Sequence, residues 1–512
     1  MARTGKEYPP TAVRIQTVTA HGIVPYMFHF NMPRLMWVGY AALFVLTIFF
    51  STYALTESPG VWYDEGYYLQ LAMNQAHHGK LELQVAPGEF VSAGFVSVGF
   101  PLIYPIAFVF DHFGVGVLQA RAVMAAFIML LMGTSLFLIW RLFGHRVALL
   151  SGTLLATFPL VYGNGKSVLG EVPGLVFLML FLICVAYLER TDFKQLRWYI
   201  LAGLFGGLCV TTKPVFLLLG PAVVITALIY RRNIRWQWFF IGVGLLSFLA
   251  PFLWWLISQF SGNSLSQIFS YYTNPYEVSN ILKLVFVNAL RFIRETTPLY
   301  CFIFTLCWSS FITIRILRRE HIRLAETTAF LFSLLVLLAY LRTPGWYRYF
   351  FIAQVFTLLF FSPAVLFITE KISSYLPKLL MNLAVPVCFT ALLILAGLQL
   401  YQLNYDSFVA SYYKSTASHE LIEYFKQVDP GKSFFLYNVP EIAIFLPNNE
   451  YYQYLHPQNS IILGEGEFSV IESGKADFVV LRAGEYPQNN VAFNLYTLRD
   501  TVSNYIVLER KL

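Results

Sequence analysis

Long apolar stretches recur over the first 400 positions, separated by short breaks that are rich in charge. A helix needs about 20 mostly apolar residues to cross the hydrocarbon core of a bilayer. About eleven stretches are candidates for such spans: 35–55, 121–142, 147–163, 171–188, 198–212, 214–230, 237–258, 297–317, 324–341, 347–369 and 379–400. We therefore expect an all-α polytopic membrane bundle of about eleven transmembrane helices.

The breaks between these stretches alternate in charge. Lys and Arg gather in every second break, from Arg141 and Arg146 to Lys371 and Lys378. Cytoplasmic loops of membrane proteins carry an excess of these residues, so we assign these breaks, and the N-terminal segment 1–34, to the cytoplasm. The expected location is the inner (plasma) membrane of a bacterium, with the C-terminal segment outside.

The segment from Phe95 to Phe110 is apolar enough to compete for a twelfth span, but it contains Pro101 and Pro105. Counting it as a span would move every later Arg cluster to the wrong side of the membrane. We therefore place it as a re-entrant or interfacial segment within the first external loop, 56–120.

The pattern changes after Tyr401, where long apolar runs end. KSFFLYN, SIILGEG, ADFVVLR and NYIVLER resemble strands, and ASHELIEYFKQV before them resembles a helix. We expect a transmembrane domain over 35–400 and a small soluble α/β domain over 401–512, outside the membrane. GEGEF matches a nucleotide-binding loop too weakly to assign one, so a structural or acceptor-handling role is predicted.

Composition agrees with a lipid environment, since 57% of the residues are hydrophobic and only 12% are charged, against about 25% charged in soluble domains. The formal charge of +7 is largely an orientation signal, and no nucleic-acid partner is expected. The five cysteines lie in apolar stretches without metal-ligand or disulfide spacing, and are predicted to be small core residues.

Two acidic sites fall on the predicted outer side. Asp64 and Glu65 follow the first span, where a Pro-Gly turn leads through aromatic residues into a helix-like run. Glu171 lies in a Gly-rich turn, two residues before Pro173. All three are suited to helix starts, where acids are stabilised by the helix dipole, so capping and chemistry both stay open.

Cations on the same side are more informative, because the positive-inside rule predicts few of them there. They are Arg121, Lys166, Lys213, Arg291, Arg294, Arg342 and Arg348. Ionisable groups at membrane depth are costly and tend to line cavities, and a phosphate is a fitting counter-charge. Snorkelling towards lipid headgroups explains Arg291 and Arg294. The remaining set favours an enzyme that acts on an anionic lipid-linked substrate.

An ordered series of motifs then carries a family resemblance. It runs WYDEGYYLQLAMNQAHHGKLEL, GFPLIYPIAFVF, FGVGVLQARAVMAAF, WRLFGHRVALLSGTLLATFPL, GEVPGLVFLMLFL, GLFGGLCVTTKPVFLL and WYRYF, over roughly positions 35 to 350. The chain resembles membrane glycosyltransferases of the GT-C fold, in particular the protein O-mannosyltransferase and lipid A aminoarabinose transferase group. The resemblance implies transfer of a sugar from a polyprenyl-phosphate donor, with Asp64 as catalytic acid residue and Glu171 as second carboxylate.

Two departures from the aminoarabinose type concern cations. That type has Arg three positions after the Asp, where this chain has Tyr67, and Lys before its PPL, where this chain reads Gly99-Phe100-Pro101-Leu102. The donor headgroup or the grip on its phosphate is therefore expected to differ. Lys166, Lys213 and Arg348 become the candidates to hold the phosphate.

The expected mechanism is a single displacement with inversion at the sugar. Asp64 takes the proton of the acceptor hydroxyl, while cations stabilise the leaving phosphate; Glu65 and Glu171 orient the acceptor or the base. The predicted substrate-binding residues are Lys166, Lys213, Arg121, Arg342, Tyr347 and Arg348, with Trp62, Tyr67 and Tyr68 as aromatic surfaces for a sugar.

No cofactor and no metal are expected, although a divalent ion held by Asp64, Glu65 and Glu171 stays an alternative. His77 and His78 are predicted to lie at the surface. The expected partners are a polyprenyl-phosphate-linked sugar, a saccharide, lipid or protein acceptor, and membrane lipids. Two other functions stay open: a transporter or flippase of lipid-linked saccharides, and a noncatalytic scaffold that acts through its C-terminal domain.

Overall fold

The computed structural model describes residues 32–94, 96–231, 234, 237–260, 280–373, 377–405, 416–455, 469–485 and 491–511. Two predicted features lie outside these residues. They are the N-terminal segment up to residue 31 and the strand-like run SIILGEG at 460–466.

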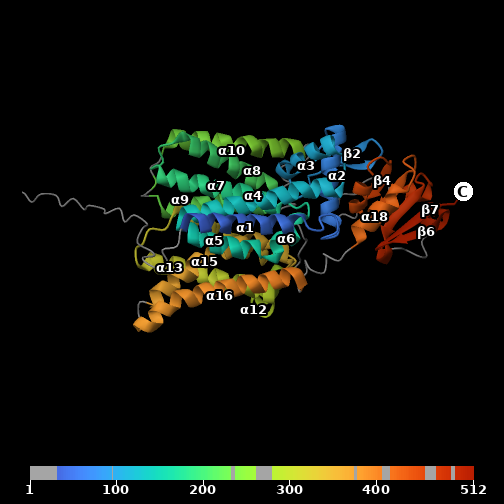
Figure 1. Ribbon diagram of the computed structural model, residues 1–512. Helices are drawn as coiled ribbons and strands as arrows, with labels where there is room; N and C mark the ends of the chain where they lie inside the picture. The colour runs from blue at the N-terminus through green and yellow to red at the C-terminus, as the bar shows by residue number, and fades with distance from the viewer. Residues whose placement is uncertain are drawn as a thin grey trace, which may run out of the picture.

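Every predicted apolar stretch is helical. The bundle consists of α1 (Met32–Thr52), α4 (Val117–Phe143), α5 (His145–Ala156), α6 (Pro159–Lys166), α7 (Glu171–Arg190), α8 (Leu196–Thr212), α9 (Leu219–Ile229), α10 (Trp238–Gln259), α13 (Thr296–Leu317), α14 (Leu324–Tyr340), α15 (Phe351–Ser373) and α16 (Lys378–Tyr405). Among the described residues, seven helices are long and apolar enough to cross a membrane, or eight if α5 and α6, bent by 61°, form one span. The predicted polytopic helical bundle is confirmed (Figure 1).

The segment assigned to a re-entrant or interfacial position forms α3 (Phe100–Phe113), an apolar helix of 14 residues. This is short of the roughly 20 residues that a span needs. It packs against α2, α4 and α8 instead.

The rest of the first loop folds over one end of the bundle. It forms α2 (Tyr63–His78) and a hairpin of β1 (Glu82–Ala86) and β2 (Glu89–Ser92). Gln259, the last residue of α10, donates from Nε2 to the carbonyls of Val96 and Val98, at 2.6 and 3.2 Å. Further along the chain, α12 (Ile281–Arg294) precedes α13.

The C-terminal segment forms the predicted α/β unit. Its elements are α18 (Ala417–Lys426), β3 (Phe434–Tyr437), the 3-10 helix η3 (Pro440–Phe445), β4 (Tyr451–Tyr454), α19 (Ser469–Glu472), β5 (Phe478–Arg482), β6 (Tyr496–Val502) and β7 (Tyr505–Arg510). The sheet order is β4-β3-β5-β7-β6; β3 runs parallel to β4 and β5, and β7 antiparallel to its neighbours. This unit lies beyond one end of the bundle, with α2 between them (Figure 1).

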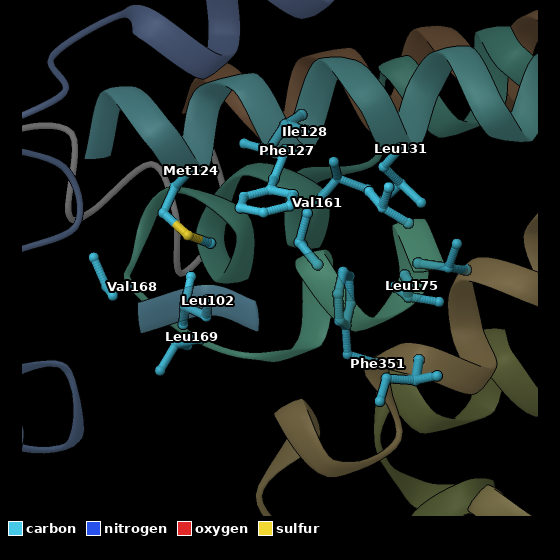
Figure 2. Close-up of a cluster of buried hydrophobic side chains, with 14 of the residues drawn as sticks. Leu102, Met124, Phe127, Ile128, Leu131, Val161, Val168, Leu169, Leu175 and Phe351 are labelled. Carbon is cyan, nitrogen blue, oxygen red and sulfur yellow. The ribbon is translucent and has the colours of Figure 1, made fainter. Parts of the chain in front are cut away.

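Figure 2 shows a cluster of buried hydrophobic side chains in the bundle. Leu102 of α3, Met124 of α4 and Leu169 belong to it, together with Leu175 of α7 and Phe351 of α15. Because Leu169 lies two residues before Glu171, and Phe351 three residues after Arg348, this core fixes the segments that hold both side chains.

Candidate functional site

Four segments that are distant in sequence meet at the end of the bundle covered by α2. They are the first turn of α2, the start of α7, the residue after α8, and the 3-10 helix η2 (Tyr347–Tyr349) before α15. They carry Asp64, Glu171, Lys213 and Arg348, in that order. The structure thus brings together two predicted carboxylates and two predicted phosphate-binding cations.

Asp64 is paired with Arg348. Oδ2 of Asp64 lies 2.5 Å from Nη1 of Arg348, and their side chains are 32% and 12% exposed. The guanidinium carbon also lies 4.8, 5.0 and 5.2 Å from the ring centroids of Trp62, Trp346 and Tyr349, in cation–π range. Burial is the largest single influence and opposes the charge of Arg348, but Asp64, Tyr349 and Glu171 together outweigh it and raise the pKa of Arg348, so Arg348 stays a cation.

Glu171 is paired with Lys213, with 2.5 Å between Oε1 and Nζ and side chains 2% and 10% exposed. Gly170 permits this approach, because a Cβ there would lie 3.1 Å from the carbonyl oxygen of Thr212. Burial, followed by the charge of Asp64, raises the pKa of Tyr68, on which Arg348 and Glu171 also act. The two ion pairs therefore belong to one electrostatic cluster around Tyr68.

This cluster contains buried polar atoms whose bonding capacity is not used. In the part of the chain that the structure describes, Nε of Arg348 and Oε2 of Glu171 are buried without a hydrogen-bond partner. Such an atom costs about 1–3 kcal/mol and is uncommon in folded proteins. A bound phosphate would satisfy the guanidinium, since Arg presents its donors in a fork that matches phosphate oxygens.

Glu65 lies on a different face of α2, in a fully buried pair with Arg121. Nε and Nη2 of Arg121 donate to its two oxygens at 3.0 and 2.8 Å. The backbone amide of Val168 donates to Oε1 at 3.0 Å, and Nη1 of Arg121 donates to the carbonyls of Leu55 and Pro59. These contacts join α2, α4 and the loop before α7, and they give Glu65 and Arg121 a structural role.

Two further predicted binding residues also make structural contacts. Lys166 is fully buried, and its Nζ donates to the carbonyl of Tyr53 at 2.6 Å. The hydroxyl of Tyr347 donates to Oε2 of Glu295 at 2.5 Å, and Nε of Arg291 donates to the same carboxylate at 2.8 Å. The Arg291, Glu295 and Tyr347 network supports the loop that presents Arg348. Snorkelling therefore does not describe Arg291.

The remaining predicted substrate-binding residues differ in how exposed their side chains are and in what they contact. Arg342 is exposed on the loop after α14. Trp62 is 38% exposed and presents an aromatic surface beside Arg348. Tyr67 donates to Tyr63 at 2.8 Å, and Tyr68 shares a 3.0 Å bond with Ser97. Trp62 is therefore the best placed of the three aromatics to contact a sugar.

His77 and His78 are exposed at the end of α2, as predicted. Among the residues that the structure describes, no three His, Cys, Asp or Glu side chains are grouped to hold a metal ion. Asp64, Glu65 and Glu171 are each paired with a different cation. The cysteines are free; Cys307 is partly exposed and the other four are buried.

Some residues of the site were missed by sequence reasoning. Trp346 and Tyr349 flank Arg348 in the motif WYRYF, and that proximity was a usable signal. No sequence signal indicated that Glu295 is a partner of Tyr347, or that Glu441 and Arg482 lie near Tyr63. These contacts join segments that are far apart in the chain.

The bundle and its C-terminal α/β unit define a membrane protein of the GT-C fold, as the sequence resemblance indicated. Residues 100–255 match the family described as dolichyl-phosphate-mannose-protein mannosyltransferase. No curated protein matches in a sequence search.

Three solved structures illustrate the likeness. Apo ArnT from Cupriavidus metallidurans has a TM-score of 0.61 at 13% identity, covering 93% of this chain and 98% of that chain. The same protein bound to undecaprenyl phosphate gives 0.62 at 14% identity, with the same coverage. The Archaeoglobus fulgidus oligosaccharyltransferase tethered with an acceptor peptide gives 0.54 at 14% identity, covering 88% of this chain and 69% of that chain.

Proposed function

We propose that this chain is a glycosyltransferase that moves a sugar from a polyprenyl-phosphate donor to a saccharide, lipid or protein acceptor, with inversion at the sugar. The observation that carries the proposal is the cluster of Asp64, Arg348, Glu171 and Lys213, in which Nε of the buried Arg348 has no hydrogen-bond partner among the described residues. The match to a mannosyltransferase family and the likeness to an ArnT bound to undecaprenyl phosphate support this choice of donor.

In this mechanism Asp64 is the general base. The acceptor oxygen forms a bond to the anomeric carbon as the bond from that carbon to the donor phosphate oxygen breaks. The acceptor proton passes to Asp64, and the bonding electrons leave with the polyprenyl phosphate. Asp64 suits this role because its side chain is partly exposed, whereas Glu65 is enclosed by Arg121 and a backbone amide.

Arg348 has one function before the donor binds and another afterwards. Without donor, its guanidinium is held by Asp64 and by three aromatic rings. An incoming phosphate competes for the guanidinium and weakens its pairing with Asp64, which leaves the carboxylate free to accept the acceptor proton once the donor is bound. Lys213, held by Glu171, supplies a second positive charge for the leaving phosphate.

The arrangement in the membrane is part of the proposal. We place the N-terminus in the cytoplasm and the C-terminal domain, beginning near residue 401, outside the plasma membrane. This puts the site on the outer face, because α2 and the C-terminal sheet lie at the same end of the bundle (Figure 1).

The test is transfer of radiolabelled sugar from polyprenyl phosphate to an acceptor by the purified protein. Asp64→Asn is expected to lower the rate by about 10²–10⁴-fold, the usual contribution of a general base, while donor binding persists. The matched control is Asp111→Asn, which changes an exposed aspartate at the end of α3. Full activity in Asp64→Asn would remove the base assignment. Translocation of the intact donor without transfer would favour a transporter.

A further inference from the structure

One face of the first half of α2 is bound to the C-terminal domain. Tyr63, Gly66 and Gln70 all contact this domain, and their spacing of three and four residues places them on one side of a helix. Asp64 and Tyr68, also four residues apart, face the bundle cluster instead. The helix that carries the proposed base is thus held between two domains (Figure 1).

Contact is closest at Gly66. A Cβ at this position would lie 2.3 Å from the backbone nitrogen of Glu441 and 2.6 Å from the carbonyl carbon of Pro440. Both atoms belong to the backbone of η3, so no side-chain rotation can relieve the overlap. Gly66, two residues after Asp64, therefore allows α2 and η3 to pack backbone against backbone.

Hydrogen bonds fix the register on both sides of this contact. Nε2 of Gln70 donates to the carbonyl of Pro440 at 2.8 Å, and the buried amides of Gln70 and Gln453 bond reciprocally at 3.1 and 2.8 Å. The Tyr63 hydroxyl donates to Oδ1 of Asn438 at 2.8 Å. Burial raises the pKa of Tyr63 to about 12, so this donor keeps its proton at neutral pH.

The surface that receives α2 is itself held firmly. Glu441 of η3 is buried, and its Oε1 accepts from Nη2 of Arg482 at 2.6 Å and from the hydroxyl of Tyr505 at 2.8 Å. Arg482 and Tyr505 belong to the central strands β5 and β7. The position of η3 is therefore set by the sheet.

We propose that the C-terminal domain is a positioning element for Asp64, which it holds against Arg348 through α2, with Gly66 and Tyr63 as the positioning residues. The catalytic consequence rests on the proposed function. The structural claim, that the C-terminal domain holds α2 in place, does not rest on the proposed function.

The test compares Gly66→Ala with Gly242→Ala in the full chain. An added Cβ at Gly242 of α10 meets nothing within 4 Å, so this control should retain wild-type behaviour. Gly66→Ala is expected to lower kcat by roughly tenfold or more with donor KM changed less than about twofold, because misplacing a catalytic group affects the chemical step. Hydrogen exchange of the amides in 63–78 should rise, with exchange elsewhere in the bundle unchanged.

Tyr63→Phe provides a milder second variant should Gly66→Ala fail to fold. It removes the bond to Asn438 and the acceptor of the Tyr67 hydroxyl, keeps the ring, and should show the same pattern with a smaller effect. Wild-type exchange across α2 in both variants would overturn the proposal, as would faster exchange with unchanged kcat. A third outcome separates the two proposals: the wild-type protein transfers no sugar, and hydrogen exchange in α2 is still faster in the variants than in the wild type. That result would support the role of the C-terminal domain in holding α2 and would reject the proposed function.

Discussion

Asp64 and Glu65 are neighbours with the same charge, but their surroundings differ. Successive residues of a helix are about 100° apart around its axis, so the two carboxylates leave α2 in different directions. Glu65 accepts three hydrogen bonds and is fully buried. Removing one partner of such a pair costs about 3–5 kcal/mol. Of the two, only Asp64 keeps contact with solvent, as the proposed general base requires.

Arg348 is the residue whose shape matters as much as its charge. Arg348→Lys keeps the charge but loses the planar fork and the stacking on Trp62, Trp346 and Tyr349. We expect donor affinity to fall by roughly tenfold, which corresponds to about 1.4 kcal/mol. Binding of labelled polyprenyl phosphate to the purified variant measures this.

Arg294→Lys is the matched control for this substitution, because Arg294 is an exposed arginine on α12. It should bind the donor as the wild type does. Equal donor affinity in wild type and Arg348→Lys would show that the guanidinium is not the phosphate ligand.

At the scale of elements, the helices were predictable because a bilayer imposes a strong constraint on composition. Even the short α3 could be separated from the spans, by its prolines and by the charge of later breaks. The partners of the site residues were not predictable, since Asp64 meets Arg348 only after some 280 intervening residues have folded. The strand β6 was also missed, because YTLRDTV has polar or charged residues at most positions.

The turn between α13 and α14 makes a pH-dependent ion pair with the end of α7. His321, in the turn between α13 and α14, lies 2.8 Å from Oε1 of Glu189 at the end of α7. The hydrogen bond to Glu189 raises the pKa of His321. A raised pKa means that the pairing stabilises the fold at pH values below the ordinary histidine range and is lost as pH rises through the shifted value.

The melting temperature should therefore fall slightly more for wild type than for His321→Ala as pH increases from about 6 to about 8.5. The difference is expected to be only about 1–2 °C, because the imidazole is largely exposed and exposed pairs contribute under about 1 kcal/mol. Thermal unfolding in detergent measures it. A steeper decline in His321→Ala would reverse the predicted sign.

On the scale of the whole molecule, the site depends on three bodies meeting at one end of the bundle. The bundle contributes Glu171, Lys213 and Arg348, the first loop contributes Asp64, and the C-terminal domain supports α2 from the other side. The site is therefore complete only when the C-terminal domain is on the same side of the membrane as α2. The proposed transfer then takes place on whichever side that domain occupies.

The orientation of the protein in the membrane therefore decides on which side the proposed transfer takes place. Lys475 is exposed on the C-terminal domain, and Arg318 is exposed beyond the end of α13 that lies away from the site. Because four of the five native cysteines are buried, Lys475→Cys and Arg318→Cys provide new reactive thiols over a low background. A membrane-impermeant maleimide added to intact spheroplasts should label Lys475→Cys, and should label Arg318→Cys only after lysis. The reverse labelling pattern would place the site in the cytoplasm. The assignment of the Arg-rich breaks to the cytoplasm by the positive-inside rule would then be wrong.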